Sequence, residues 1–314
     1  MAHNKVGSLL LQITEGIGDD CYEMFQPKGV AVVIHNDVSF RPQLNPGGKI
    51  SRTSQTSASS KTDESGVYEK VMKSFCLQLG YYIISRSHLT GPELKRHMIG
   101  LSNQYHDYNG RHNSLLVVVS AQSNERGRIV TNDERKSMPI SKLLENFKSN
   151  HCTSLLDKPK VFIFLMRVTV RDPVLPSLGS RTRKVTLQEN EEDEKFFHPD
   201  ALDLEDDFLV VRLMSENMEH AEGGPTFGGV SINTETTVPD FANTLLETLS
   251  EKCAVNDIEN ILKNVKTEIE EEYNTPRFSP SFDTDFGFKN NQNSHVKMFI
   301  DSTLRKKMYF LPGL

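Results

Sequence analysis

The run "KPKVFIFLMRVTV", Lys158 to Val170, constrains the fold more than any other stretch of the chain. A lysine-proline turn leads into a continuous apolar segment, which is typical of a strand buried on both faces of a parallel sheet. Such sheets are covered by helices on each side. Arg167 stands near the carboxyl end of this strand, where open α/β sheets usually place their functional residues.

Similar apolar runs alternate with amphipathic segments along the chain. Strands are predicted within "KGVAVVIHNDVSF", "YYIISRSHL", "NSLLVVVSAQS", "DFLVVRLM" and the C-terminal "SHVKMFIDSTLRKKMYFLP", and helices are predicted over 67–80, 90–105, 140–150, 238–253 and 255–273. This order predicts an α/β protein with a mostly parallel six-stranded sheet and helices on both faces. Gly80 and Thr90 are the expected stop and start signals of the first two helices.

The sequence divides into four parts that together form one domain. We expect residues 1–27 to be a short N-terminal segment without a recruitment prodomain, and residues 28–172 to hold the first strands and helices. Residues 173–206 are basic and then strongly acidic, with little apolar periodicity, which predicts an exposed linker. Residues 207–314 carry the remaining strand and helix signals.

Composition excludes several classes of function. The chain has 314 residues, and its 36 basic against 42 acidic side chains give a net charge of −6, which disfavours nucleic acid or an anionic membrane as a partner. No apolar run reaches the roughly 20 residues that a membrane span needs. The four cysteines are scattered without a Cys-x-x-Cys pair, so we expect a cytoplasmic protein with free thiols and neither a metal nor a cofactor.

Four strings in the same order resemble the caspases, cysteine proteases that cleave after aspartate. "KPKVFIFLMRVT" resembles the family's strand before the pentapeptide Gln-Ala-Cys-Arg-Gly, and "NSLLVVVSAQS" resembles its strand ending in Ser-His-Gly. "DFANTLLETLSEKCAVNDIENILKNVKTEIEEEY" is similar to the two helices of the small subunit, and "STLRKKMYF" to the family's C-terminal ending. The resemblance implies a caspase-like fold, with residues 28–172 similar to the large subunit and 207–314 to the small subunit.

The resemblance also implies that both catalytic residues are missing. Aligned on these strings, the nucleophile position is Arg167 and the base position is Ala121, 46 residues earlier, with Gln122 where the family has glycine. Arginine stays protonated and has no lone pair for attack, and alanine cannot transfer a proton. We therefore predict that the chain is not an enzyme.

The same alignment locates the family's other functional positions in this sequence, and some of them carry a different type of residue. The substrate-pocket positions fall on Ser59, Ile232 and Asn233, although Arg52 could substitute if its loop allowed. The strand that pairs subunits in the family corresponds to Met298, Phe299, Ile300, Asp301, Ser302 and Thr303. Candidate cleavage positions in the acidic linker are Asp193, Asp200, Asp203 and Asp206; a solvated acidic run explains the same residues equally well.

The resulting hypothesis is a pseudo-caspase that regulates apoptosis. It would form a heterodimer with an active caspase or its zymogen and inhibit the zymogen's self-activation; homodimerisation is a second option. One alternative is an active cysteine endopeptidase with a relocated nucleophile, for which Cys152 beside His151 is the candidate. Another alternative is a module that binds peptides in the old cleft without cutting them.

Overall fold

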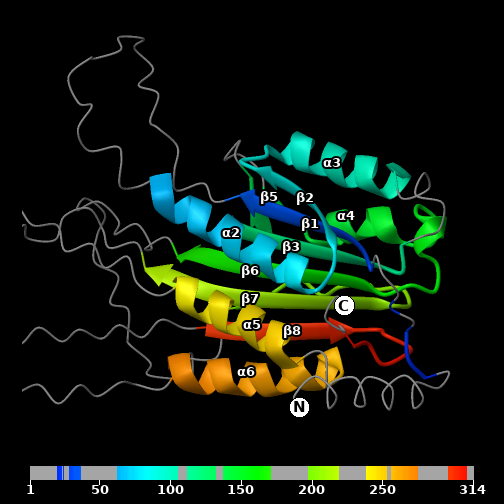
Figure 1. Ribbon diagram of the computed structural model, residues 1–314. Helices are drawn as coiled ribbons and strands as arrows, with labels where there is room; N and C mark the ends of the chain where they lie inside the picture. Colours follow the sequence, from blue (N-terminus) through cyan, green and yellow to red (C-terminus); the bar gives the residue numbers. More distant parts are fainter. Residues whose placement is uncertain are drawn as a thin grey trace, which may run out of the picture.

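A computed structural model describes residues 20–22, 24, 28–36, 62–104, 112–131, 137–170, 197–218, 238–252, 256–274 and 296–309. These residues form one mixed sheet flanked by helices (Figure 1). The strands on the main path are β1 (Gly29–Asn36), β2 (Tyr82–Ser87), β3 (Ser114–Ser123), β6 (Lys160–Val170), β7 (Phe208–Met218) and β8 (Val296–Ser302). The helices are α2 (Thr62–Gln78), α3 (Gly91–Gln104), α4 (Ser141–Leu144), α5 (Val238–Lys252) and α6 (Ile258–Asn274).

The strand order is β2-β1-β3-β6-β7-β8, and every neighbouring pair is parallel except β7 and β8. This confirms the mostly parallel sheet, whose main path has the six expected strands. Two short strands that the sequence analysis missed, β4 (Ile129–Val130) and β5 (Ser137–Met138), add a hairpin beyond the end of β3. Two residues each give too little alternation to be read as strands.

Helices cover both faces of the sheet, as predicted. One core cluster joins the sheet to α2, α5 and α6, through residues such as Phe75, Leu249 and Ile261. The other joins it to α3 and α4, through residues such as Leu94 and Leu143. The inner strands β1, β3, β6 and β7 are therefore buried on both sides, which is why their sequences are apolar without alternation.

Local signals explain where the first two described helices end and begin. Gly80 adopts a left-handed φ of 78° directly after α2, a conformation that glycine reaches at little cost. Thr90 precedes α3, where its backbone N–H and its hydroxyl both donate to the Glu93 carboxylate. Both agree with the sequence analysis.

The third predicted helix is shorter than its pattern suggested. Only Ser141–Leu144 is α-helical, and Glu145–Phe147 continues as a 3-10 turn. The Asn146 amide donates to the carbonyls of Lys142 and Leu143, which offers these acceptors an alternative to helical N–H groups.

The structure describes only the last part of the predicted linker over 173–206. Residues 171–196 lie outside the described residues, but 197–206 pack on the sheet's α3 side. Phe197 is buried, and the N–H groups of His198 and Asp200 donate to the carbonyls of Glu125 and Arg126 beside β4. Phe197 is buried and Leu202 and Leu204 are partly buried, while the acidic residues among them stay exposed or partly exposed, so this stretch runs along the surface with its apolar side chains turned inward.

Candidate functional site

The two residues that the sequence analysis aligned with the family's catalytic positions, Ala121 and Arg167, lie near the carboxyl ends of β3 and β6. In the parallel pairing of these strands, Gln122 is opposite Arg167 and Ala121 is opposite Met166. Paired residues of neighbouring strands project from the same face, and successive residues from opposite faces. Arg167 therefore shares the face of α2, α5 and α6, whereas Ala121 and Met166 belong to the core under α3 and α4.

This arrangement has a direct chemical consequence. Ala121 is 4% exposed within an apolar cluster, and β3 continues without a break to Ser123. A side chain at 121 is directed away from the side chain at 167, so a histidine there would not reach a cysteine at 167 without a change in backbone. Arg167 itself is half-buried between the buried Met166 and Val168.

Several polar residues lie at the carboxyl ends of the strands, on the face of the sheet to which Arg167 belongs. The strand register places His35 opposite Ser120, and Arg167 opposite Ser215. His35 is 2% exposed at the end of β1. The pKa of the nearby Glu69 on α2 is lowered, first by a hydrogen bond from Lys73 and least by the charge of His35.

The two buried cysteines lack the features of a relocated nucleophile. Burial raises the pKa of Cys76 to about 12 and also raises the pKa of Cys152 above that of an ordinary thiol. Cys152 precedes the amino end of β6, whereas Arg167 lies near the carboxyl end of the same strand. The neighbouring His151 is exposed. A reactive thiolate needs a lowered pKa and access. Cys21 is half-buried at a bridge to Lys307, and Cys253 lies outside the described residues.

The substrate-pocket positions Ser59, Ile232 and Asn233, together with Arg52, also lie outside the described residues. Within the described part of the chain, no group of three or more His, Cys, Asp or Glu side chains could hold a metal ion. No described helix is both long enough and apolar enough to cross a membrane.

The predicted pairing strand is the last strand of the main sheet path. β8 pairs with β7 on one side, and the described residues place no strand against its other side. The N–H and C=O of Thr303 both bond to the stretch that leads into β7, so strand alternation turns the polar groups of Ser302, Ile300 and Met298 outward. The Met298 side chain is buried in the core, so its outward contribution is limited to the backbone.

One outward group of β8 is already engaged. The Met298 N–H donates to a carboxylate oxygen of Glu270 on α6 at 3.0 Å. Phe299 and Ile300 are half-buried, while Asp301 binds the buried Arg212 at 2.8 Å. The edge is thus partly covered by its own helix, a common protection against unwanted strand pairing.

The predicted cleavage positions differ in accessibility. Asp193 lies outside the described residues. Asp200 binds Arg128 at 2.9 Å, and its carbonyl accepts from Arg212. Asp203 binds Lys148 with a side chain that is 97% exposed, and Asp206 is 74% exposed in the turn before β7. The backbone around these three residues is held against the body on both sides.

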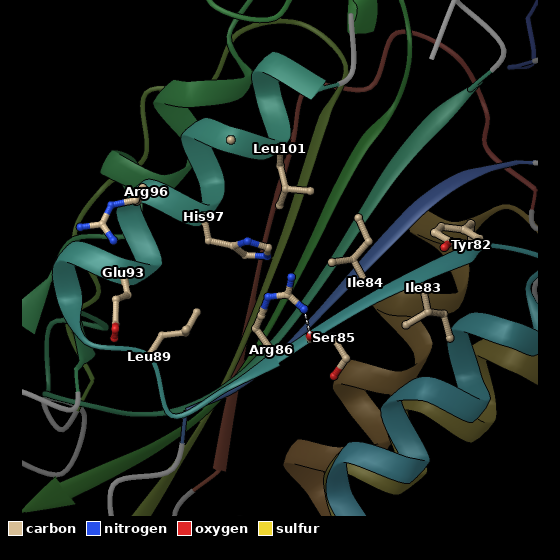
Figure 2. Close-up of a pocket in the computed structure, with 11 residues that line it drawn as sticks. Tyr82, Ile83, Ile84, Ser85, Arg86, Leu89, Glu93, Arg96, His97 and Leu101 are labelled. Carbon is tan, nitrogen blue, oxygen red and sulfur yellow. Dashed lines mark hydrogen bonds between the residues drawn. The ribbon is translucent and has the colours of Figure 1, made fainter. Parts of the chain in front are cut away.

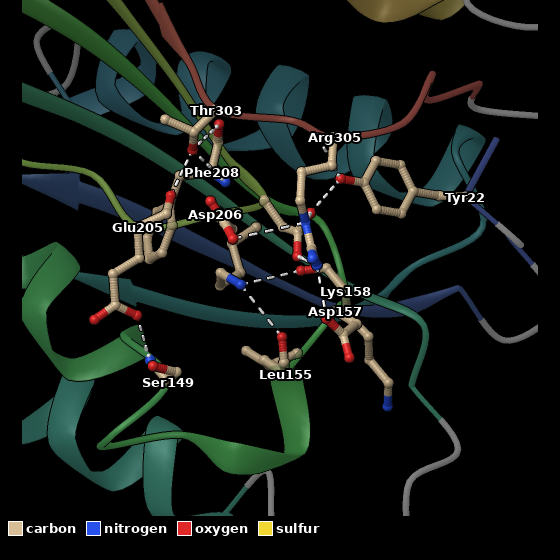
Figure 3. Close-up of polar contacts among 12 residues, drawn as sticks. Tyr22, Ser149, Leu155, Asp157, Lys158, Glu205, Asp206, Phe208, Thr303 and Arg305 are labelled. Atoms are coloured by element: carbon tan, nitrogen blue, oxygen red, sulfur yellow. Dashed lines mark hydrogen bonds and ion pairs between the residues drawn. The ribbon is translucent and has the colours of Figure 1, made fainter. Parts of the chain in front are cut away.

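A second polar cluster, at the amino ends of β6 and β7, joins distant parts of the chain (Figure 3). Asp207 is nearly fully buried and accepts hydrogen bonds from Tyr22 at 2.5 Å and from Arg305. Arg305 also contacts Asp157 at 2.6 Å. Burial alone would raise the pKa of Asp207, but the bonds from Arg305 and Tyr22 outweigh it and lower that pKa. The sequence analysis did not find this cluster, whose members are up to 283 positions apart.

The strand order and the helices on both faces are those of a caspase-like α/β domain. The sequence profile described as "Caspase domain" matches residues 67–309, so the chain belongs to the caspase family. Among solved structures, one described as "structure of pro-sf-caspase-1" has a TM-score of 0.54 at 16% identity, covering 93% of this chain and 99% of the other. That likeness supports the fold alone. No curated protein matches the chain in sequence.

Proposed function

We propose that this chain is a catalytically inactive caspase homologue that binds an active caspase or its zymogen and inhibits the zymogen's autoactivation. The observation that supports the proposal is that Ala121 and Arg167, which the sequence alignment assigns to the family's base and nucleophile positions, project from opposite faces of adjacent strands. Caspase chemistry needs a thiolate and an imidazole at one point. Neither side chain can supply those functions.

The second support is the edge strand β8. Ile300 and Ser302 present outward backbone groups beside a strand that is otherwise well packed, which suits pairing with an equivalent strand of a partner. A heterodimer formed there would contain one competent site and one incompetent site. Because zymogens activate by associating, sequestering one in such a pair would slow its self-processing. We place this action in the cytoplasm, and treat homodimerisation as a competing use of the same edge.

The test combines catalysis with binding. The purified chain is first assayed alone on an aspartyl-peptide substrate, where we expect no cleavage above background. It is then titrated into a caspase zymogen from the same source while the appearance of processed zymogen is followed over time. We expect processing to slow in proportion to the added chain. Cleavage by the chain alone, abolished by Cys152→Ala, would overturn the proposal.

An edge-strand variant tests the binding surface. Ile300→Pro removes an outward N–H that makes no bond to β7, so the sheet's own ladder is kept. Ile300→Val is the matched control, because it keeps the N–H and most of the packing. Inhibition lost in the proline variant but kept in the valine variant, with similar thermal unfolding of both, supports docking through β8. Equal inhibition by both variants would contradict this docking mode.

A further inference from the structure

We propose that the groove between β2 and α3 is a binding site for a small organic anion, with a carboxylate or phosphate joined to an apolar body. The groove lies at the opposite end of the sheet path from β8, and its lining residues come from β2, α3 and the turn between them rather than from β3 or β6 (Figure 2). Its cavity volume is about 610 Å³, which is within the range of small-molecule sites.

One wall of the groove is a row of alternate residues on β2. Tyr82, Ile84 and Arg86 are two positions apart and so project from the same face of the edge strand. Tyr82 is 65% exposed, so its ring is accessible to a ligand in the groove. The row passes from aromatic to aliphatic to cationic, which fits a ligand that is apolar at one end and anionic at the other.

The other wall is one face of α3. Glu93, His97, Gly100 and Leu101 recur at helical spacing, and all of them line the groove. Figure 2 shows the Arg86 guanidinium directed toward the imidazole of His97. Two basic groups from different elements thus meet at one end of the groove.

Among the described residues, no carboxylate neutralises the charge of Arg86. The Arg86 side chain donates to the neighbouring Ser85 carbonyl, and no described carboxylate lies within ion-pair distance of it. Glu93, the acidic lining residue, is committed to the N–H and hydroxyl of Thr90. The His97 Nε2 atom is buried without a hydrogen-bond partner among the described residues. Burial first, and the charge of Arg86 second, lower the pKa of His97.

Gly100 gives the site an unusual test. A Cβ placed on this glycine would meet no atom within 4 Å, so a side chain there projects into open space in the groove. Glycine in a helix interior is also less favourable than leucine. Gly100→Leu should therefore fill the site without a loss of stability, which separates blocked binding from unfolding.

The experiment titrates four probes into the full chain, followed by ligand-observed NMR and by calorimetry. Phenyl phosphate and 3-phenylpropionate test the two anionic sources, inorganic phosphate tests the charge alone, and 3-phenylpropan-1-ol tests the apolar body alone. We expect at least one aromatic anion to bind saturably, with a dissociation constant of about 1 mM or tighter, and the alcohol to bind more weakly.

Variants then locate the binding. Arg86→Gln should weaken the anion about tenfold or more, because it removes a charge-assisted hydrogen bond. Gly100→Leu should abolish binding while unfolding at the same or a higher temperature. The controls are Arg126→Gln, an exposed arginine beside β4, and Ile99→Leu, the exposed neighbour on α3. Neither control should change the affinity.

Three results would overturn the inference. The first is the absence of saturable binding by either aromatic anion. The second is equal affinity for the alcohol, which would reduce the site to an apolar surface. The third is binding that survives Gly100→Leu or weakens equally in Arg126→Gln, which would place the anion elsewhere on the chain.

Discussion

Replacing Asp207 by asparagine removes the charge at the centre of the cluster that joins both halves of the domain. The substitution is nearly isosteric, and it preserves the backbone because asparagine tolerates the left-handed φ of 67° that Asp207 adopts. The substitution changes the hydrogen-bond acceptor. A buried carboxylate that accepts hydrogen bonds from Tyr22 and Arg305 becomes a neutral amide, and the NH₂ group of that amide faces one of these donors.

The magnitude follows from the burial of Asp207. Its side chain is 2% exposed, and a hydrogen bond to a buried charged group contributes about 1.5 to 3 kcal/mol to stability. Asparagine keeps one acceptor oxygen, so part of this contribution survives. We expect Asp207→Asn to lower the free energy of unfolding by about 2 to 3 kcal/mol near neutral pH, below the full cost of orphaning a buried charge.

Urea denaturation followed by circular dichroism measures this difference, with Asp206→Asn as the matched control. Asp206 is 74% exposed and 3.9 Å from Arg305, so its substitution should leave the midpoint unchanged. The pKa of Asp207 is lowered in the folded state, so its stabilisation is present above the unfolded pKa of about 3.9 and is lost as the pH falls through the lower folded value. A loss below about 1 kcal/mol, or one undiminished in acid, would refute this reasoning.

Three further results are expected. Glu270→Ala frees the Met298 N–H on the outer side of β8. Size-exclusion chromatography with light scattering should therefore show more self-association in this variant than in Glu271→Ala, which replaces an exposed neighbour. An unchanged monomer fraction would contradict the protective role of this contact. An active caspase should cut the chain after Asp193 before it cuts after Asp200, whose backbone is held at both its N–H and its C=O; intact-mass analysis over time would show the reverse if the packed stretch opens readily. Cys152 should react with iodoacetamide far more slowly than a free thiol, since burial raises its pKa, and rapid labelling mapped to it would revive a relocated nucleophile.

The sequence predicted the parts of this fold that are periodic and local. Continuous apolar runs identified the main strands, and Gly80 marked a helix end because only the local backbone is involved. The extent of the packed stretch 197–206 could not be predicted, because its acidic residues are held by Arg128, Lys148 and Ser149 from a distant part of the chain. Pairing of that kind depends on the finished fold.

The burial of the lysine at the start of β6 also could not be predicted from the sequence. Lys160 is 4% exposed, its ammonium donates to the carbonyls of Leu155 and Lys158, and it lies 4.9 Å from the centre of the Phe208 ring. A sequence pattern predicts an exposed lysine in such a turn, because burial of an amine is costly without partners. Here the partners are two backbone carbonyls and a ring contributed by the next strand.

For the candidate site, the sequence shows which residues occupy the aligned positions, and the fold shows toward which face of the sheet their side chains project. The alignment predicted Ala121 and Arg167 at the two catalytic positions, but only the strand register places their side chains on opposite faces. Reintroducing histidine and cysteine at these positions is therefore insufficient for catalysis, because the carboxyl end of β3 would also have to leave the sheet before Ala121. A double variant, Ala121→His with Arg167→Cys, should not cleave aspartyl peptides. Measurable cleavage by it would show that this end of β3 is free to move, and that the side chains at 121 and 167 alone decide whether the chain cleaves.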